Sequence, residues 1–238
     1  MRFVIAILAF VMLNGSFAVP VVAQDTGTIY GRVSTKGHKE VLAKWLSQSI
    51  ENDEPAAESY GSKNGLPDGA IDYSNLSGIF VILTDTGYKG GRFHEARVDS
   101  DGFWPAALAV SVGDKIRVEN KTSNDITVYL AGDGDDDIQE FPVIEEGRSE
   151  TIVVKLTGDL ELGVDELDDE IMSVASGAGW RTKRLSSGDD YEFEDLKAGP
   201  YDVVFWFWRL GSIVRKVTLN SGQRLKVDEI LSVDRIVK

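Results

Sequence analysis

The chain has 238 residues, with 25 lysines and arginines against 39 aspartates and glutamates, and a net charge of −14. This balance repels nucleic acids and anionic lipids, so we expect neither as a partner. The chain has no cysteine and only two histidines, which excludes disulfide bonds, thiol catalysis and a blue-copper site that needs a thiolate ligand. Stability must therefore come from apolar packing, for which a hydrophobic content of 42% is adequate.

The first 23 residues have the form of a signal peptide. Arg2 gives a basic start, an apolar run follows over residues 3–13, and small residues precede Gln24. This apolar run of about 11 residues is too short for a helix that crosses a bilayer about 30 Å thick. We therefore expect cleavage before Gln24 and a periplasmic or secreted protein without stable membrane insertion.

Residues 24–87 are expected to combine N-terminal strands with a helix and a long loop. Residues 27–34 alternate in the manner of a strand, while residues 39–52 place apolar side chains on one helical stripe. Residues 53–77 are rich in turn-forming side chains and predict a long surface loop. Residues 78–84 are continuously apolar, which is typical of a strand that is buried on both faces.

The remaining chain has short apolar segments separated by turns, a pattern that is typical of all-β sandwich proteins. Strands are predicted over residues 115–118, 125–130, 149–156, 172–175, 191–196, 201–208, 212–219 and 224–231. We assign residues 88–176 to one domain and residues 177–238 to a second, smaller β domain, with which residues 24–87 can pack. The predicted fold class is therefore all-β, with one short helix in the N-terminal part.

The segment Val112–Asn120, VGDKIRVEN, resembles part of the cupredoxin (plastocyanin-like) family, especially its exported bacterial members of the methylamine-utilisation-like type. The resemblance implies a Greek-key sandwich for residues 88–176 and assigns four former copper-ligand positions. These positions hold Ile126, Glu166, Asp169 and Met172 in this chain. Since only the methionine is a usual copper ligand, the resemblance implies a cupredoxin-like domain that lacks the copper ligands.

The segment 189–203, DDYEFEDLKAGPYDV, resembles the carboxypeptidase-regulatory-like (prealbumin-like) β-sandwich family. Residues 27–33 and 78–83 resemble the first two strands of the same module. The resemblance implies a small sandwich without a catalytic motif. It also implies that the cupredoxin-like part is an insertion within this sandwich.

Calcium is the metal that the acidic residues favour most. Asp133, Asp135 and Asp137 have a D-x-D-x-D spacing, which can present alternate carboxylates to a hard cation. Glu166 and Asp169 can contribute if the two acidic loops meet at one end of the sandwich. The alternative is a solvated acidic loop that only adds to the negative surface.

Copper is disfavoured because the chain has no thiolate ligand. Both histidines, His38 and His94, fall in predicted loops, where a lone histidine is usually incidental. A copper site built from these histidines and Met172 has no further support in the sequence. We therefore expect no cofactor, with Ca²⁺ as the open alternative.

The aromatic segment 205–208 alternates phenylalanine and tryptophan, so Trp206 and Trp208 share one face of a strand. If this face is exposed, the two rings form a platform for sugar rings or for a partner protein. If it is buried, the inserted domain must cover it, and the tryptophans belong to a domain interface. The sequence leaves both alternatives open.

Enzyme motifs are missing from the sequence, which contains no nucleophile elbow, P-loop, dinucleotide-binding motif or zinc-protease motif. We therefore predict a non-enzymatic binding or scaffold protein with a protein or glycan partner in the cell envelope. Two alternatives stay open. One is a copper-binding or electron-transfer protein of the cupredoxin class, and the other is a carbohydrate-binding module that uses Trp206 and Trp208.

Overall fold

The computed structural model describes residues 26–36, 76–132, 134, 137–167 and 171–232, and this part of the chain is built from strands without a helix. The prediction of an all-β fold is thereby confirmed. The predicted signal peptide, the predicted helix at 39–52 and most of the predicted loop at 53–77 lie outside the described residues. Within the described ranges, no helix is present that could cross a membrane.

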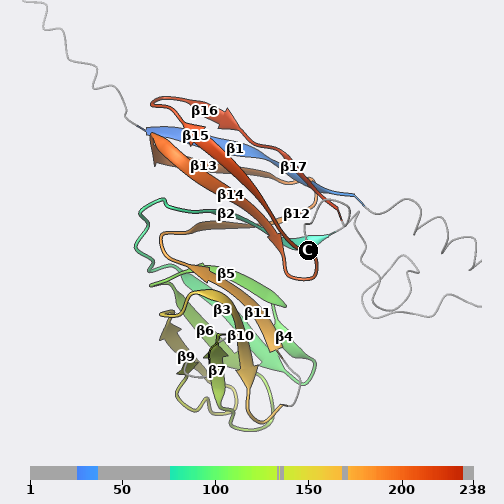
Figure 1. The fold of residues 1–238 in the computed structure, drawn as a ribbon. Helices are drawn as coiled ribbons and strands as arrows, with labels where there is room; N and C mark the ends of the chain where they lie inside the picture. Colours follow the sequence, from blue (N-terminus) through green and yellow to red (C-terminus); the bar gives the residue numbers. More distant parts are fainter. Residues whose placement is uncertain (1–25, 37–75, 133, 135–136, 168–170, 233–238) are drawn as a thin grey trace, which may run out of the picture.

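Four sheets stack on one another in the structure (Figure 1). Two of them contain the first and last strands of the chain, and we call this pair the outer sandwich. Its first sheet has the order β13 (Asp190–Lys197), β1 (Thr26–Thr35) and β16 (Arg224–Lys226), and β17 (Glu229–Leu231) also pairs with β1. Its second sheet has the order β12 (Arg181–Ser186), β2 (Ser77–Leu83), β14 (Gly199–Phe207) and β15 (Gly211–Leu219).

The other two sheets contain the strands that lie between β2 and β12 in the sequence, and we call them the inserted sandwich. One sheet has the order β5 (Ala107–Ser111), β11 (Ile171–Gly177), β10 (Gly158–Val164), β7 (Val128–Ala131) and β8 (Ile138–Glu140). The other has the order β4 (Gly102–Trp104), β3 (Phe93–Asp99), β6 (Lys115–Asn120) and β9 (Ser149–Val153). The parallel pairs β3–β6 and β5–β11 require chain crossovers between the two sheets.

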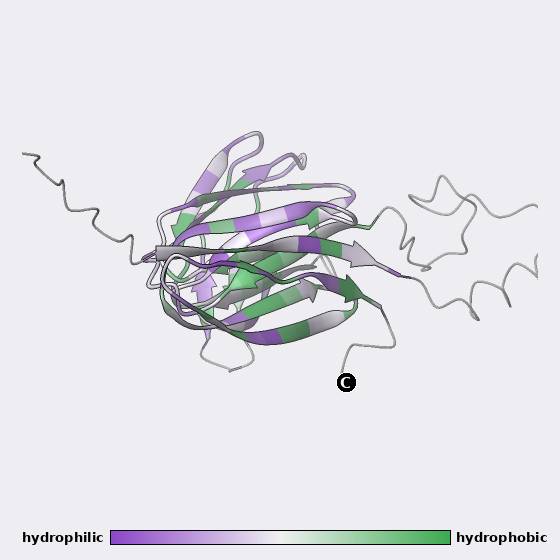
Figure 2. Cartoon of the chain, turned by 90° about the horizontal axis from the view of Figure 1, so that it is seen from above, coloured by the Kyte–Doolittle hydropathy of each residue, from purple (hydrophilic) through white to green (hydrophobic). Residues whose placement is uncertain are grey.

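Each sandwich has its own apolar core because the strands alternate buried and more exposed side chains, as in β14. A matching alternation of hydrophobic and hydrophilic residues is visible along several strands in the view from above (Figure 2). The outer core contains Ile29, Phe193 and Phe205, which are almost fully buried. The inserted core contains Ile116 and Leu162 at its centre.

Strand β1 holds the two ends of the described chain together. It pairs antiparallel with β13 on one side and parallel with β16 and β17 on the other. At Gly31 the neighbouring backbone comes so close that an added Cβ would overlap the carbonyl of Val227. The amide of Val227 donates to the carbonyl of Tyr30 at 2.7 Å, so this close approach belongs to the sheet pairing.

Several strands differ from the sequence prediction. The predicted strands do not include β3, β4, β5, β8, β10 or β12, and the predicted strand 224–231 is divided into β16 and β17. Strand β12 has only one buried residue, Thr182, so it offers little apolar periodicity. The prediction that His94 lies in a loop is wrong, because it lies in β3.

Candidate binding sites at the junction of the two sandwiches

A third apolar layer joins the two sandwiches. Strand β2 contributes Phe80 and Ile82 to this layer, while its alternate residues face the outer core. Strand β5 contributes Ala107 and Ala109 from the other side. Both strands are therefore buried on two faces, and for β2 this confirms what its continuous apolar run predicts.

Trp206 lies on the junction side of β14, whereas Phe205 and Phe207 belong to the outer core. The predicted strand 201–208 ends at Phe207, so Trp208 lies in the turn directly after β14, where it packs against both the junction layer and the outer core. The rings of Trp206 and Phe80 are tilted against each other, with centroids 5.5 Å apart. Both tryptophans are half-buried. They therefore combine the two roles that the sequence leaves open, since they pack at the interface and still reach a solvent-accessible hollow.

We call this space the tryptophan hollow, and it has a volume of about 370 Å³. Trp206 and Trp208 line it from the outer sandwich. Asp159 and Glu161 on β10 and Ser173 on β11 line it from the inserted sandwich. The hollow thus combines aromatic rings with carboxylate and hydroxyl oxygens that can accept hydrogen bonds.

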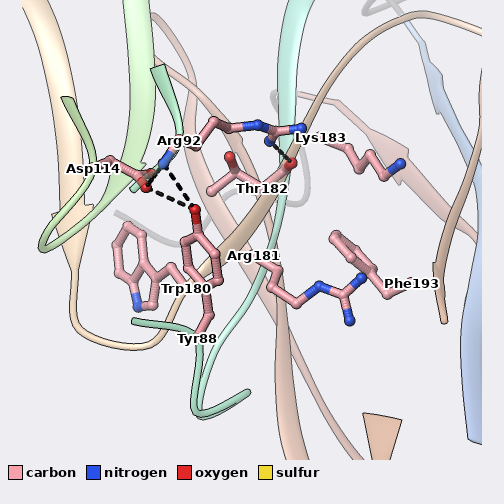
Figure 3. A pocket seen from close by; sticks show the side chains of 8 residues that line it. All are labelled: Tyr88, Arg92, Asp114, Trp180, Arg181, Thr182, Lys183 and Phe193. Carbon is pink, nitrogen blue, oxygen red and sulfur yellow. Dashed lines mark hydrogen bonds between the residues drawn. The ribbon is translucent and has the colours of Figure 1, made fainter. Parts of the chain in front are cut away.

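A second hollow lies at the junction on the β12 side of β2, whereas Trp206 and Trp208 come from β14 and the turn after it, on the other side of β2. It has a volume of about 220 Å³, and we call it the cationic hollow. Its lining residues are shown in Figure 3 and comprise Tyr88, Arg92, Asp114, Trp180, Arg181, Thr182, Lys183 and Phe193. Three of these eight side chains carry a positive charge although the whole chain has a net charge of −14.

Asp114 organises one wall of the cationic hollow, and it is only 2% exposed. Its Oδ1 accepts hydrogen bonds from the Tyr88 hydroxyl at 2.9 Å and the Arg92 amide at 3.0 Å. Its Oδ2 accepts a hydrogen bond from the Ser111 amide at 2.9 Å and lies 2.9 Å from Nε2 of His94. Both carboxylate oxygens therefore have two partners each.

The pKa of Asp114 lies below its ordinary value. Burial by itself raises this pKa, but the hydrogen bonds from Ser111, His94, Tyr88 and Arg92 together lower it further than burial raises it. The same neighbourhood raises the pKa of Tyr88, first through burial and then through its hydrogen bond to Asp114. The carboxylate is therefore held ionised and the phenol is held neutral.

Two glycines allow the loop before β3 to reach Asp114. Gly90 has a φ of +77° and Gly113 a φ of +90°, and an added Cβ on Gly90 would overlap the backbone of Gly113. The loop is also fixed at Thr86, whose hydroxyl donates to the carbonyl of Gly179 at 2.7 Å. These contacts place Tyr88 and the Arg92 amide over the carboxylate.

Trp180 forms the aromatic side of the cationic hollow. Its amide donates to Oγ of Ser111 at 3.2 Å, and that hydroxyl donates to the carbonyl of Gly177 at 3.2 Å. An added Cβ on Gly177 would overlap the indole ring of Trp180. The indole ring of Trp180 can take this position only because residue 177 is a glycine.

We expect the substitution Gly177→Ala to lower the free energy of unfolding by about 1–3 kcal/mol, because the new methyl group displaces the indole ring of Trp180. Urea unfolding followed by circular dichroism measures this change. The double variant Gly177→Ala with Trp180→Leu removes the overlap and should recover most of the loss. Strictly additive effects of the two substitutions would contradict this explanation.

Asn120, the last residue of the VGDKIRVEN segment, is fully buried and organises a turn. Its Nδ2 donates to the carbonyls of Asn124 at 2.7 Å and Ile144 at 2.9 Å. Its Oδ1 accepts from the amide of Thr122 at 2.9 Å and from its hydroxyl at 2.7 Å. The two buried polar residues of the segment, Asp114 and Asn120, thus stabilise loops at the two ends of β6.

The former copper-ligand positions have different environments. Ile126 and Met172 are buried in the inserted core. Glu166 is exposed and accepts hydrogen bonds from the amide of Thr127 at 2.8 Å and from its hydroxyl at 3.0 Å. Asp169 lies outside the described residues.

The proposed calcium ligands Asp133 and Asp135 also lie outside the described residues, so the structure does not place the acidic loop as a whole. The amide of Asp137 donates to the carbonyl of Gly134 at 3.0 Å. Among the residues that the structure describes, no three histidine or carboxylate side chains are grouped so that they could hold a metal ion. His94 instead pairs with Asp114, and His38 is not described.

Sequence reasoning did not identify the residues of the cationic hollow. Asp114 belongs to the segment that carries the cupredoxin resemblance, but a Gly-Asp pair before a strand is also an ordinary turn signal. Tyr88 lies 26 positions from Asp114 and Arg92 lies 90 positions from Thr182, so no local pattern connects them. Only the pairing of the sheets brings these residues together.

No protein-family model matches the chain, and no curated protein matches its sequence. Among solved structures, a mutant of amicyanin in its Cu(I) state is 14% identical, with 34% of this chain and 79% of that chain covered and a TM-score of 0.31. A purple cupredoxin from Nitrosopumilus maritimus is 13% identical, with 34% and 97% covered and a TM-score of 0.30. A copper-containing nitrite reductase from Thermus scotoductus is 11% identical, with 34% and 21% covered and a TM-score of 0.30. These neighbours are cupredoxins, but similarity at this level indicates neither a shared function nor a shared metal.

Proposed function

We propose that this chain is a non-enzymatic binding protein of the cell envelope that binds a glycan in the tryptophan hollow. The observation that carries the proposal is the joint presence of Trp206 and Trp208 with Asp159 and Glu161 around one open space of about 370 Å³. Aromatic rings offer flat apolar faces, and carboxylates accept hydrogen bonds from hydroxyl groups. A sugar presents both kinds of surface. The signal peptide predicted for residues 1–23 supports export.

The hollow has the size and composition of a ligand site. Pockets for small ligands commonly have volumes of about 300–1,000 Å³ and combine apolar walls with a few polar groups. The rings of Trp206 and Trp208 are the apolar part, while Asp159 and Glu161 are exposed and free to rotate toward a ligand. Ser173 adds a hydroxyl group that can donate or accept.

The two sandwiches supply different halves of this site, since Trp206 and Trp208 come from β14 and the turn after it, and the polar residues come from β10 and β11. Their relative position is fixed by the apolar junction layer around Phe80, Ile82, Ala107 and Ala109. A site assembled in this way needs little ordering when a ligand binds, and this reduces the entropic cost of binding.

The carboxylates favour a neutral glycan. Asp159 and Glu161 accept hydrogen bonds from sugar hydroxyl groups but repel carboxylated or sulfated sugars. The net charge of −14 adds to this repulsion at long range. We therefore assign the tryptophan hollow to neutral, hydroxyl-rich oligosaccharides.

The test is a titration of the exported protein with cellohexaose, xylohexaose, mannohexaose and chitohexaose, followed by tryptophan fluorescence and calorimetry. We expect saturable binding of at least one sugar. The double variant Asp159→Asn with Glu161→Gln should weaken this binding by about tenfold, which corresponds to about 1.4 kcal/mol. These two side chains are exposed, so the variant should fold normally.

The matched control is Trp104→Ala, because Trp104 is 54% exposed and lines neither hollow. Its substitution should leave sugar affinity unchanged. A lack of heat and of fluorescence change across the panel would overturn the proposal. Binding that depends on Trp104, rather than on Asp159 and Glu161, would overturn it as well.

A further inference from the structure

The cationic hollow lies on the other side of β2 from the tryptophan hollow, and its chemistry is different. We propose that it binds an oxyanion, that is, a carboxylate, sulfate or phosphate group of a small ligand. This inference uses none of the residues of the glycan site and holds or fails separately from it.

The charges of the hollow are available to a ligand. Within the described part of the chain, Arg92, Arg181 and Lys183 form no ion pair with a carboxylate, although carboxylates outnumber cations in the sequence. Arg92 donates from its Nη1 to the carbonyl of Thr182 at 3.0 Å, and Arg181 donates from its Nη1 to the carbonyl of Glu194 at 2.6 Å. Each guanidinium has five N–H donors, so most of them stay available.

The backbone contacts hold the two guanidinium groups in place. A guanidinium that is already oriented loses less freedom when it forms two parallel hydrogen bonds with an oxyanion. Arg181 is further steadied by the ring of Phe193, whose centroid lies 5.7 Å from its Cζ atom. Lys183 is exposed and adds a third positive charge, whose flexible side chain can adjust its position to the ligand.

The one carboxylate in the wall does not compete with a ligand for these cations. Asp114 is buried, and both its oxygens are occupied by Tyr88, His94 and two backbone amides. In Figure 3, Asp114, Tyr88 and Trp180 lie on one side of the hollow, while the charged ends of the three cations lie on the other. One wall of the hollow therefore holds a carboxylate whose hydrogen bonds are already formed, and the opposite wall carries the positive charges.

The size of the hollow limits the ligand. At about 220 Å³ it is smaller than the usual range of about 300–1,000 Å³ for pockets that hold drug-sized molecules. It fits a small anion or the charged end of a larger molecule. The aromatic rings of Tyr88 and Trp180 offer apolar contact to the part of the ligand next to the charged group.

The indole N–H resonance of Trp180 gives a local readout, because the chain has only five tryptophans and the variant Trp180→Phe assigns the signal. Inorganic phosphate, sulfate and acetate are titrated at constant ionic strength, with chloride as the reference. We expect a saturable shift of the Trp180 signal with at least one oxyanion and no such shift with chloride. The order of the three affinities identifies the oxyanion class that the hollow prefers.

The double variant Arg92→Gln with Lys183→Gln should weaken this binding by about tenfold or more, because charge-assisted hydrogen bonds are lost. The charge-matched control is Lys197→Gln with Lys216→Gln, which removes two exposed lysines that line neither hollow. Circular dichroism and the thermal midpoint establish that each variant is folded. A shift that does not saturate, an equal response to chloride, or equal weakening in both double variants would overturn the proposal.

Discussion

Replacing Asp114 with alanine is expected to lower the free energy of unfolding by about 3–5 kcal/mol, the range found when one partner of a buried charged network is removed. The substitution leaves the Tyr88 hydroxyl and the amides of Ser111 and Arg92 without their acceptor. The loop before β3 also loses its main polar contact with the inserted sandwich. Urea unfolding followed by circular dichroism measures the difference.

Asp165→Ala is the matched control for this experiment, because Asp165 is an exposed carboxylate of the same sandwich. Its substitution should change stability by no more than about 0.5 kcal/mol. Asp114→Asn keeps the shape of the side chain but loses its charge, and it should give an intermediate loss. Equal stability of Asp114→Ala and the unchanged protein would contradict the role of the carboxylate as the centre of this network.

The lowered pKa of Asp114 also makes stability depend on pH. The unfolded chain releases this proton near the ordinary aspartate pKa of 3.8, and the folded protein releases it at a lower pH. The stabilisation is therefore present above pH 3.8 and is lost as the pH falls through the pKa of the folded state. Comparison with Asp114→Asn between pH 6 and pH 2 should show a smaller acid-induced loss in the variant.

The substitution Gly31→Ala is expected to lower the free energy of unfolding by about 3 kcal/mol or more, at the upper end of what overpacking causes. A Cβ at this position overlaps the carbonyl of Val227, which belongs to the backbone and cannot rotate away as a side chain would. Either β1 or the chain between β16 and β17 must shift, and the hydrogen bond from Val227 to Tyr30 is then weakened. Chemical unfolding measures the loss.

Thr28→Ala provides the comparison on the same strand, because Thr28 is only partly buried. This substitution should cost less than about 1 kcal/mol. A similar loss for both variants would mean that β1 is sensitive to any change, and the explanation by backbone overlap would be wrong. A large loss for Gly31→Ala alone supports it.

The apolar pattern was sufficient to predict the central strands of the stack. Residues 78–84 and 201–208 predict β2 and β14, and the continuous apolar run of the first correctly predicts burial on both faces. Strands β3 and β12 were not predicted, because both contain many polar residues and few buried ones, and their sequences therefore lack a clear apolar alternation. Their place is determined by pairing with β6 and β2, which are distant in the sequence.

The sites were less predictable than the strands. The alternation of residues 205–208 identifies Trp206 and Trp208, but their partners Asp159 and Glu161 come from the other sandwich. The acidic residues of the sequence suggest a metal, whereas the cationic hollow depends on three positive side chains within a negative chain. Such sites form where sheets pack together, so their residues are distant in the sequence and no local sequence pattern predicts them.

The position of the inserted sandwich also determines the order in which the chain can fold. Strand β1 has to find β13, and the pairing of Arg32 with Asp190 spans 158 positions. If the inserted sandwich folds first, it brings its own ends together, because Leu83 pairs with Arg181. Once the inserted sandwich has folded, the chain between β1 and β13 is effectively shorter, and the entropic cost of bringing these two strands together falls.

If the predicted signal peptide directs export from the N-terminus, β1 and β2 emerge long before β13 to β17. Both early strands carry apolar faces and unpaired edges during this interval. The outer sandwich is therefore the last part to form, although it contains the first strand. Delivery of about the final fifty residues is the step that ends the exposure of β1, because these residues carry its pairing partners β13, β16 and β17.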